Sequence, residues 1–114
     1  MEAGTHVTGV GSYTTDMREV DTELVRRARV IVDQREAILE EAGDIAGPIA
    51  DGAVDASVMV GEIGDIVLGR VPGRTSAEEV TFFKSVGNAV QDVAVAARVL
   101  ETAEREGLGA VVEI

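Results

Sequence analysis

Three short apolar runs along this chain have the pattern of β-strands. Residues 5–11 end in glycines, residues 29–33 centre on Val-Ile-Val, and residues 80–85 read Val-Thr-Phe-Phe-Lys-Ser. Consecutive apolar residues between charges are typical of strands whose two faces are both covered. The chain is therefore expected to contain about three strands, and residues 49–60 are left ambiguous.

Apolar residues at helical spacing alternate with these strands. They predict a helix of about two turns near residues 21–28 and further helices over 34–42, 62–68 and 88–106. Gly47-Pro48 is expected to break the pattern after the second helix, and the tail from Gly107 to Ile114 to be a short strand or frayed. Strands that alternate with helices favour an α/β fold with a parallel sheet and helical crossovers.

Capping residues mark where these helices begin and end. Asp16, with Glu19 three residues on, has the spacing of a capping box, Asp21 is a second candidate N-cap, and Asn88 opens the last helix. Glycines suited to a left-handed C-terminal residue stand at three expected helix ends: Gly43, Gly69 and Gly107.

The last helix is apolar on nearly its whole circumference. Alanine, valine and leucine occupy most of its positions from Ala89 to Leu100. A helix of this kind is normally buried all round. A chain of 114 residues cannot supply that cover, so it is expected to oligomerise or to be part of something larger.

Composition narrows the class of protein. The net charge of −11 argues against partners that need a basic patch, such as nucleic acid or an anionic membrane. There are no cysteines and one histidine, which leaves little room for a metal site. No signal peptide or membrane span is expected, so a cytoplasmic protein is the default. The single lysine, Lys84, fits either a salt-loving host or a GC-rich genome.

Two glycine-containing turns are candidates for ligand binding. Gly9 to Thr14 contains a partial G-x-G, but it lacks the third glycine of a dinucleotide fingerprint and the helix directly after it. The turn after the strand over residues 80–85 is better placed, because ligands of open α/β sheets bind beyond the carboxyl ends of strands. There Ser85 either binds a ligand or satisfies local backbone, and Lys84 either neutralises an anion or forms a structural ion pair.

The other polar residues carry less signal. His6 is interpreted as a packed, hydrogen-bonded residue, and the carboxylates at positions 19, 21, 23, 40, 41 and 44 as mostly a solvated face. Arg70 and Arg74 on a Pro-Gly loop either grip a carboxylate or face solvent. The sequence shows no nucleophile–base pair. From the residues alone, it is a piece of an α/β nucleotide-type domain without a self-contained active site.

Several ordered motifs nevertheless resemble those of the ornithine cyclodeaminase/mu-crystallin family. They are GTHVTGVGSYTTDMREVD from residue 4, Val32-Asp33, EAGD from residue 41, EIGD from residue 62, Gly69-Arg70 and FKSVGNAVQD from residue 83. The resemblance extends from residue 4 to about residue 107, which is essentially the whole chain.

This resemblance implies a partial Rossmann-like, three-layer αβα unit of an NAD(P)-dependent oxidoreductase that acts on α-imino or α-amino acids. Residues 1–87 would be the later half of the cofactor-binding domain. Residues 88–114 would return to a dimerisation and substrate domain. Family chains are about three times longer, and the resemblance places their glycine-rich loop and substrate-gripping residues upstream of the matched part. The chain is expected to be inactive alone.

The resemblance also implies roles for individual residues. The turn Val10, Gly11, Ser12 and Tyr13 resembles the segment along the nicotinamide of NAD or NADP, and Ser85 and Val86 resemble the pair that contacts the ring from the last strand. Tyr13 stands where ornithine cyclodeaminases carry a catalytic aspartate, so ketimine or pyrroline-carboxylate reduction is favoured over ornithine cyclodeamination. Thr8 and Thr15 replace the family's usual asparagine and proline.

Two alternatives stay open. The first is a non-catalytic dimerising module that reuses the half-domain, which is suggested by the apolar last helix. The second is a subunit completed by a separately encoded N-terminal half. A homodimer or a missing N-terminal half is therefore the expected partner, besides a small imino or amino acid.

Overall fold

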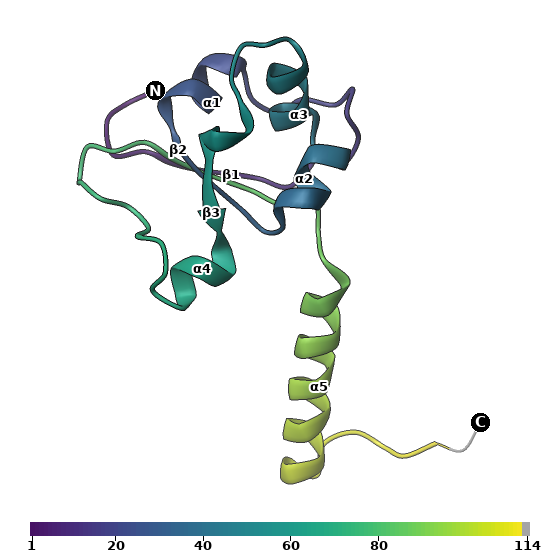
Figure 1. Cartoon of the computed structure of the whole chain (residues 1–114). Helices are drawn as coiled ribbons and strands as arrows, with labels where there is room; N and C mark the ends of the chain where they lie inside the picture. The colour runs from purple at the N-terminus through teal and green to yellow at the C-terminus, as the bar shows by residue number, and fades with distance from the viewer. Residues whose placement is uncertain (113–114) are drawn as a thin grey trace.

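The centre of the structure is a sheet of four parallel strands (Figure 1). The computed structural model describes residues 1–112. The strands are β1 (His6–Gly9), β2 (Arg29–Val32), β3 (Met59–Glu62) and β4 (Thr81–Lys84), and their order across the sheet is β1-β4-β2-β3. The predicted α/β class and the parallel sheet are confirmed.

The sheet has four strands where the sequence predicted about three, and β3 is the strand that was not predicted. Its residues alternate between buried and half-buried, as at a sheet edge, and its third residue is Gly61. Glycine weakens the strand signal. Here the glycine leaves room for a neighbour, because a Cβ at this position would lie 3.1 Å from a methyl group of Val71.

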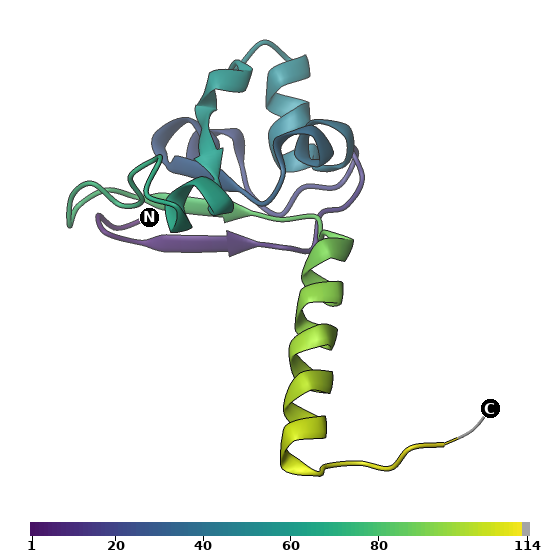
Figure 2. The same cartoon turned by 60° about the horizontal axis from the view of Figure 1, so that its bottom comes forward.

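Six helical segments connect and flank the strands. They are α1 (Thr22–Arg27), α2 (Arg35–Glu41), α3 (Gly43–Ala50), the 3-10 turn η1 (Ala56–Val58), α4 (Ile63–Val67) and α5 (Ala89–Glu106). Helices α1, α2 and α3 gather on one side of the sheet (Figures 1 and 2). Between them and the sheet lies the core, which contains Phe82, Val30 and Val32 from the strands and Val25, Ile38 and Ile45 from the helices.

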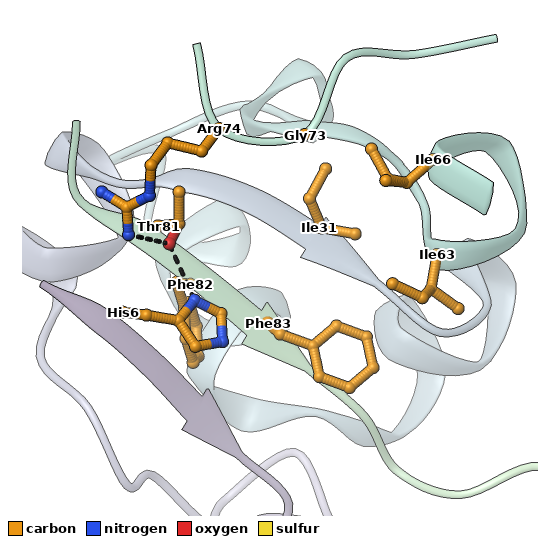
Figure 3. Close-up of a pocket in the computed structure, with 9 residues that line it drawn as sticks. All are labelled: His6, Ile31, Ile63, Ile66, Gly73, Arg74, Thr81, Phe82 and Phe83. Atoms are coloured by element: carbon orange, nitrogen blue, oxygen red, sulfur yellow. Dashed lines mark hydrogen bonds between the residues drawn. The ribbon is translucent and has the colours of Figure 1, made fainter. Parts of the chain in front are cut away.

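The other face of the sheet is largely open. Among residues 1–112, only α4 and the loop after it lie against it, where Ile63 and Ile66 face Ile31 and Phe83 across a hollow of about 520 Å³ (Figure 3). Parallel sheets normally have both faces covered. The second helical layer of a three-layer unit is thus represented here by one short helix.

Helix α5 stands clear of the sheet and its helices (Figures 1 and 2). None of its residues is buried, and Val93, Val99 and Leu100 are each at least 60% exposed. The radius of gyration is 17.6 Å, against about 13 Å for a compact domain of about 100 residues. The apolar surface that the sequence expected to need a cover is therefore uncovered in the isolated chain.

Most of the predicted helix ends are confirmed. Asp21 caps α1 by accepting the Leu24 N–H at 2.8 Å, and Asn88 caps α5 by accepting the Val90 N–H at 3.1 Å. Gly107 ends α5 in the left-handed conformation, with φ of 65°. No strand forms over residues 108–112, and positions 113–114 of the predicted tail lie outside the described residues.

Three local predictions were wrong. No helix begins at Asp16, because the Glu19 side chain that would complete the capping box is bound elsewhere. Gly43 follows the end of α2 as predicted, but it is not in the left-handed conformation. It begins α3, and α3 continues through Pro48 instead of breaking at Gly47-Pro48. Pro48 and Ile45 are buried, and their burial offsets the backbone hydrogen bond that a proline inside a helix removes.

Gly43→Ala should destabilise the chain, whereas Gly64→Ala should not. A Cβ at Gly43 would collide with the carbonyl oxygens of Met17 and Thr15, but a Cβ at Gly64, also in a helix, meets no atom within 4 Å. We expect Gly43→Ala to cost more than about 1 kcal/mol through overpacking, and Gly64→Ala to stabilise by about 0.5 kcal/mol through helix propensity. Urea unfolding measures both, and equal effects would contradict this packing.

Candidate functional site

The turn after β1 lies beside the end of β4 at the carboxyl edge of the sheet. Strands β1 and β4 are paired, and the Ser85 N–H donates to the Gly9 carbonyl at 3.1 Å. Within the turn, Val10 and Tyr13 are exposed, whereas the Ser12 side chain is buried and its hydroxyl donates to the Met17 carbonyl at 2.8 Å. The two segments singled out in the sequence therefore start from neighbouring strands.

Glu19 holds the turn in place. Its Oε2 accepts the N–H groups of Gly11 at 2.8 Å and Ser12 at 3.1 Å. A Cβ at Gly11 would lie 2.6 Å from Glu19 Oε1, so a larger residue here would displace the Glu19 carboxylate. A charged acceptor shared by two backbone donors is a strong hydrogen-bonding arrangement, so the turn has a fixed backbone although half of it faces solvent.

Lys84 links this turn to helix α3. Its ammonium group is fully buried and lies 3.0 Å from Glu19 Oε2 and 3.0 Å from Asp44 Oδ2. The other oxygen of Asp44 accepts the N–H groups of Glu19 at 2.6 Å and Val20 at 3.1 Å. Of the two roles considered for Lys84, the structure shows the ion pair. The hydrogen bond from Lys84, followed by those from Ser12 and Gly11, holds the pKa of Glu19 below its ordinary value.

Asp33, the residue directly after β2, holds the second turn, which follows β4. Its Oδ2 accepts the Ser85 hydroxyl at 2.6 Å and the N–H groups of Val86 at 3.1 Å and Gly87 at 3.2 Å. Its Oδ1 accepts the Gln34 N–H at 2.7 Å. The Ser85 hydroxyl is thus hydrogen-bonded within the protein. The turn that contains Ser85 lies at the carboxyl edge of the sheet and is fixed there by the residue after the neighbouring strand β2.

The sequence interpretation missed these carboxylates. Glu19 and Asp44 were assigned to a solvated face. In the structure Asp44 is buried and accepts the Glu19 N–H, and the Glu19 carboxylate accepts the Gly11 N–H. Asp33 was named only as part of the Val32-Asp33 motif and was given no role, although one signal pointed to it. An acidic residue directly after a buried parallel strand lies at the edge where ligands and turns meet.

A separate polar group lies at the amino end of the strands. His6 Nδ1 is 2.7 Å from Thr81 Oγ1, which also accepts from Arg74 Nη2 at 3.1 Å (Figure 3). His6 is hydrogen-bonded as expected but exposed rather than packed. Arg74 is bound to the sheet, and Arg70 lies 3.5 Å from Asp65. His6 and Arg74 therefore lie at the amino ends of β1 and β4, away from the two turns at the carboxyl edge.

Residues 1–112 contain neither a metal-binding cluster nor a membrane-spanning helix. No group of three or more histidine or acidic side chains is arranged to hold a metal ion. No helix in this range has both the length and the apolar character that a bilayer crossing requires.

A parallel α/β sheet whose fixed turns gather at its carboxyl edge is the architecture of a nucleotide-binding domain. The model of the ornithine cyclodeaminase/mu-crystallin family matches residues 1–107, and the chain belongs to that family. The resemblance seen in the sequence motifs is thereby confirmed.

Three relatives show what the chain is similar to. It is 40% identical over 114 residues to a Δ1-pyrroline-2-carboxylate reductase of Bacillus cereus, a match that covers 99% of the chain and 35% of the relative. The Δ1-pyrroline-2-carboxylate reductase of Thermococcus litoralis in complex with NADH and L-proline superposes with a TM-score of 0.91 at 39% identity, over 98% of this chain and 35% of that one. An archaeal alanine dehydrogenase dimer with bound NAD superposes with a TM-score of 0.86 at 33% identity, over 99% of this chain and 35% of the dehydrogenase chain.

The chain therefore spans about a third of the length of the relatives it matches. Its structural neighbours include two NAD- or NADH-bound reductases and an NAD-bound dehydrogenase, which supports NAD(P) use in the family.

Glu19→Gln should reduce the dependence of stability on pH. Because the folded-state pKa of Glu19 is lowered, its contribution is complete above the unfolded-state pKa of about 4.3 and is lost as pH falls through the lower folded-state pKa. Urea unfolding from about pH 7 to pH 3 measures that loss, which should be smaller in Glu19→Gln. The matched control is Glu40→Gln, at an exposed position on α2, which should follow the wild type. An unchanged slope in Glu19→Gln would contradict the assignment.

Proposed function

We propose that this chain forms one wall of the nicotinamide site in an NAD(P)-dependent oxidoreductase that reduces α-imino acids, of the ketimine or pyrroline-carboxylate type. The observation that carries the proposal is the adjacency of the Val10–Tyr13 turn and the Ser85–Val86 segment at the carboxyl edge of the sheet. Similarity to Δ1-pyrroline-2-carboxylate reductases supports the reaction class. We place this activity in the cytoplasm.

The residues at this edge fit the ring of the cofactor better than its phosphates. Phosphate groups bind to free backbone N–H groups at such turns. Here the N–H groups of Gly11 and Ser12 are bound to Glu19, and those of Val86 and Gly87 to Asp33. A neutral or cationic ring is compatible with these carboxylates, whereas a pyrophosphate would be repelled and would need other donors.

When bound, the reduced nicotinamide supplies the hydride for an imino carbon. The role of this chain would be to orient the ring from one side: Val10, Gly11, Ser12 and Tyr13 after β1 and the adjacent Ser85 and Val86 after β4 would form the same wall. Tyr13 carries a phenol where ornithine cyclodeaminases have a catalytic aspartate, and it is 61% exposed. The proposed reaction is therefore reduction of an imine rather than cyclodeamination.

We further propose that residues 1–87 belong to the cofactor-binding domain and that residues 88–114 lead to a dimerisation or substrate domain. The support is the contrast between a packed sheet unit and a helix α5 with no buried residue. The open sheet face and α5 both need a cover of apolar character. In an active enzyme, that cover would be the remaining two-thirds of a family protein and a partner subunit.

The alternative of a non-catalytic dimerising module rests on the same helix. Five large apolar side chains on α5 are at least 60% exposed: Val90, Val93, Val95, Val99 and Leu100. Large exposed apolar patches mark interaction surfaces. The alternative of one half of a split enzyme differs only in where the missing part is encoded.

A chimera tests the proposed function. The 114 residues would replace the matching third of the Bacillus cereus reductase, and proline formation from Δ1-pyrroline-2-carboxylate would be followed with NADH and with NADPH. We expect turnover by the chimera and none by the chain alone. A folded chimera with the oligomeric state of the relative but no turnover with either cofactor would contradict the proposal, as would turnover by the isolated chain.

The isolated chain should self-associate through α5. Sedimentation velocity at micromolar concentration should show species larger than a monomer, and Val93→Glu should shift them toward monomer by placing a charge on the apolar face. Gln91→Glu adds the same charge on the face of Arg98 and Glu101, so it serves as the matched control and should sediment like the wild type. A clean wild-type monomer would contradict a working α5 interface.

A further inference from the structure

Asp33 is the most heavily used acceptor at the carboxyl edge. It is 8% exposed, and its two oxygens receive four donors: the Ser85 hydroxyl and the N–H groups of Gln34, Val86 and Gly87. The shortest of these contacts is the one from the Ser85 hydroxyl, at 2.6 Å. In this contact the Ser85 hydroxyl donates and Asp33 Oδ2 accepts, so the hydroxyl hydrogen of Ser85 points to Asp33.

This contact decides what the Ser85 hydroxyl can offer a ligand. A hydroxyl has one hydrogen and two acceptor lone pairs. The hydrogen is bound to Asp33, and one lone pair accepts the Gly87 N–H at 3.1 Å. One lone pair remains, and the hydroxyl therefore has no hydrogen left for a ligand's carbonyl or carboxylate oxygen.

We propose that Asp33 is a positioning residue that fixes Ser85 Oγ as a hydrogen-bond acceptor, so that this edge selects a ring bearing an N–H donor. The inference rests on the proposed function, in which Ser85 contacts the nicotinamide. The carboxamide of nicotinamide carries such a donor in its NH2 group. A ring with an acetyl group in the same position has the same shape but a methyl group in place of the NH2.

The surrounding backbone supports the same selectivity. The N–H groups of Val86 and Gly87 are bound to Asp33, so they are not available to a ligand's oxygen either. The Asp33 carboxylate also repels an anion. Asp33 thus has two effects: it orients the Ser85 hydroxyl, and it occupies the N–H groups of Val86 and Gly87.

The test compares two neutral pyridines on the intact chain. Nicotinamide and 3-acetylpyridine are titrated separately, and binding is followed by the amide NMR signals of Val86 and Gly87. We expect 3-acetylpyridine to bind about tenfold more weakly, the ratio for one hydrogen bond lost at a site that leaves its partner unpaired. Equal affinities, or a preference for 3-acetylpyridine, would overturn the inference.

Variants separate positioning from a merely structural role. Ser85→Ala and Asp33→Ala should both bring the affinity ratio to about one, because the first removes the acceptor and the second frees the hydroxyl to donate. Asp33→Asn keeps an acceptor oxygen and should retain part of the preference. Glu36→Ala, at an exposed position on α2, is the matched control and should keep the full ratio.

The outcomes also distinguish this inference from the proposed function. If Asp33→Ala does not fold, Ser85→Ala and Asp33→Asn still decide the role of the hydroxyl. An unchanged ratio in folded Asp33→Ala or in Ser85→Ala overturns the inference and leaves the nicotinamide contact intact. No response of these amide signals to either ring overturns both the inference and the proposed contact, whatever the turnover of the chimera.

Discussion

The carboxyl edge of this sheet depends on one buried ammonium group. Lys84 is the last residue of β4, and it is fully buried between the carboxylates of Glu19 and Asp44. A buried charge is tolerated only when it is paired, and removing one partner of such a pair costs about 3–5 kcal/mol. Because Glu19 holds the turn after β1 and Asp44 lies in α3, the ion pairs join strand, turn and helix at one point.

The two turns at the edge are built on the same principle. In each, a carboxylate from another segment accepts two consecutive backbone N–H groups: Glu19 those of Gly11 and Ser12, and Asp33 those of Val86 and Gly87. Charge-assisted hydrogen bonds of this kind fix backbone more firmly than neutral ones. The turns are therefore rigid without a ligand, and their donors are occupied. This arrangement suits a flat, uncharged or cationic group and disfavours phosphate.

How far the sequence predicted this structure depended on the range of the interactions. Most local signals worked: the Asp21 and Asn88 caps, the Gly107 stop and the three apolar strands were recognised. The Asp16 capping box and the break expected at Pro48 were wrong, because Glu19 is bound to another turn and Pro48 is buried within α3. Strand β3 was missed because its Gly61 is explained only by the packing of Val71 against it. The two turns proposed here as site segments were singled out by their motifs. Their carboxylate partners were not, since Glu19 meets Lys84 across 65 positions and Asp33 meets Ser85 across 52, and no local pattern records such contacts.

The central claim is that the nicotinamide ring lies against the wall formed by the two turns, and a crystal structure of the chimeric reductase with NADH tests it most directly. The account predicts the ring in contact with the Val10–Tyr13 turn and with Ser85 and Val86, its carboxamide nitrogen toward Ser85 Oγ, and the phosphates away from this edge. A ring bound elsewhere, or a phosphate seated on the Gly11 or Gly87 amide, would contradict it.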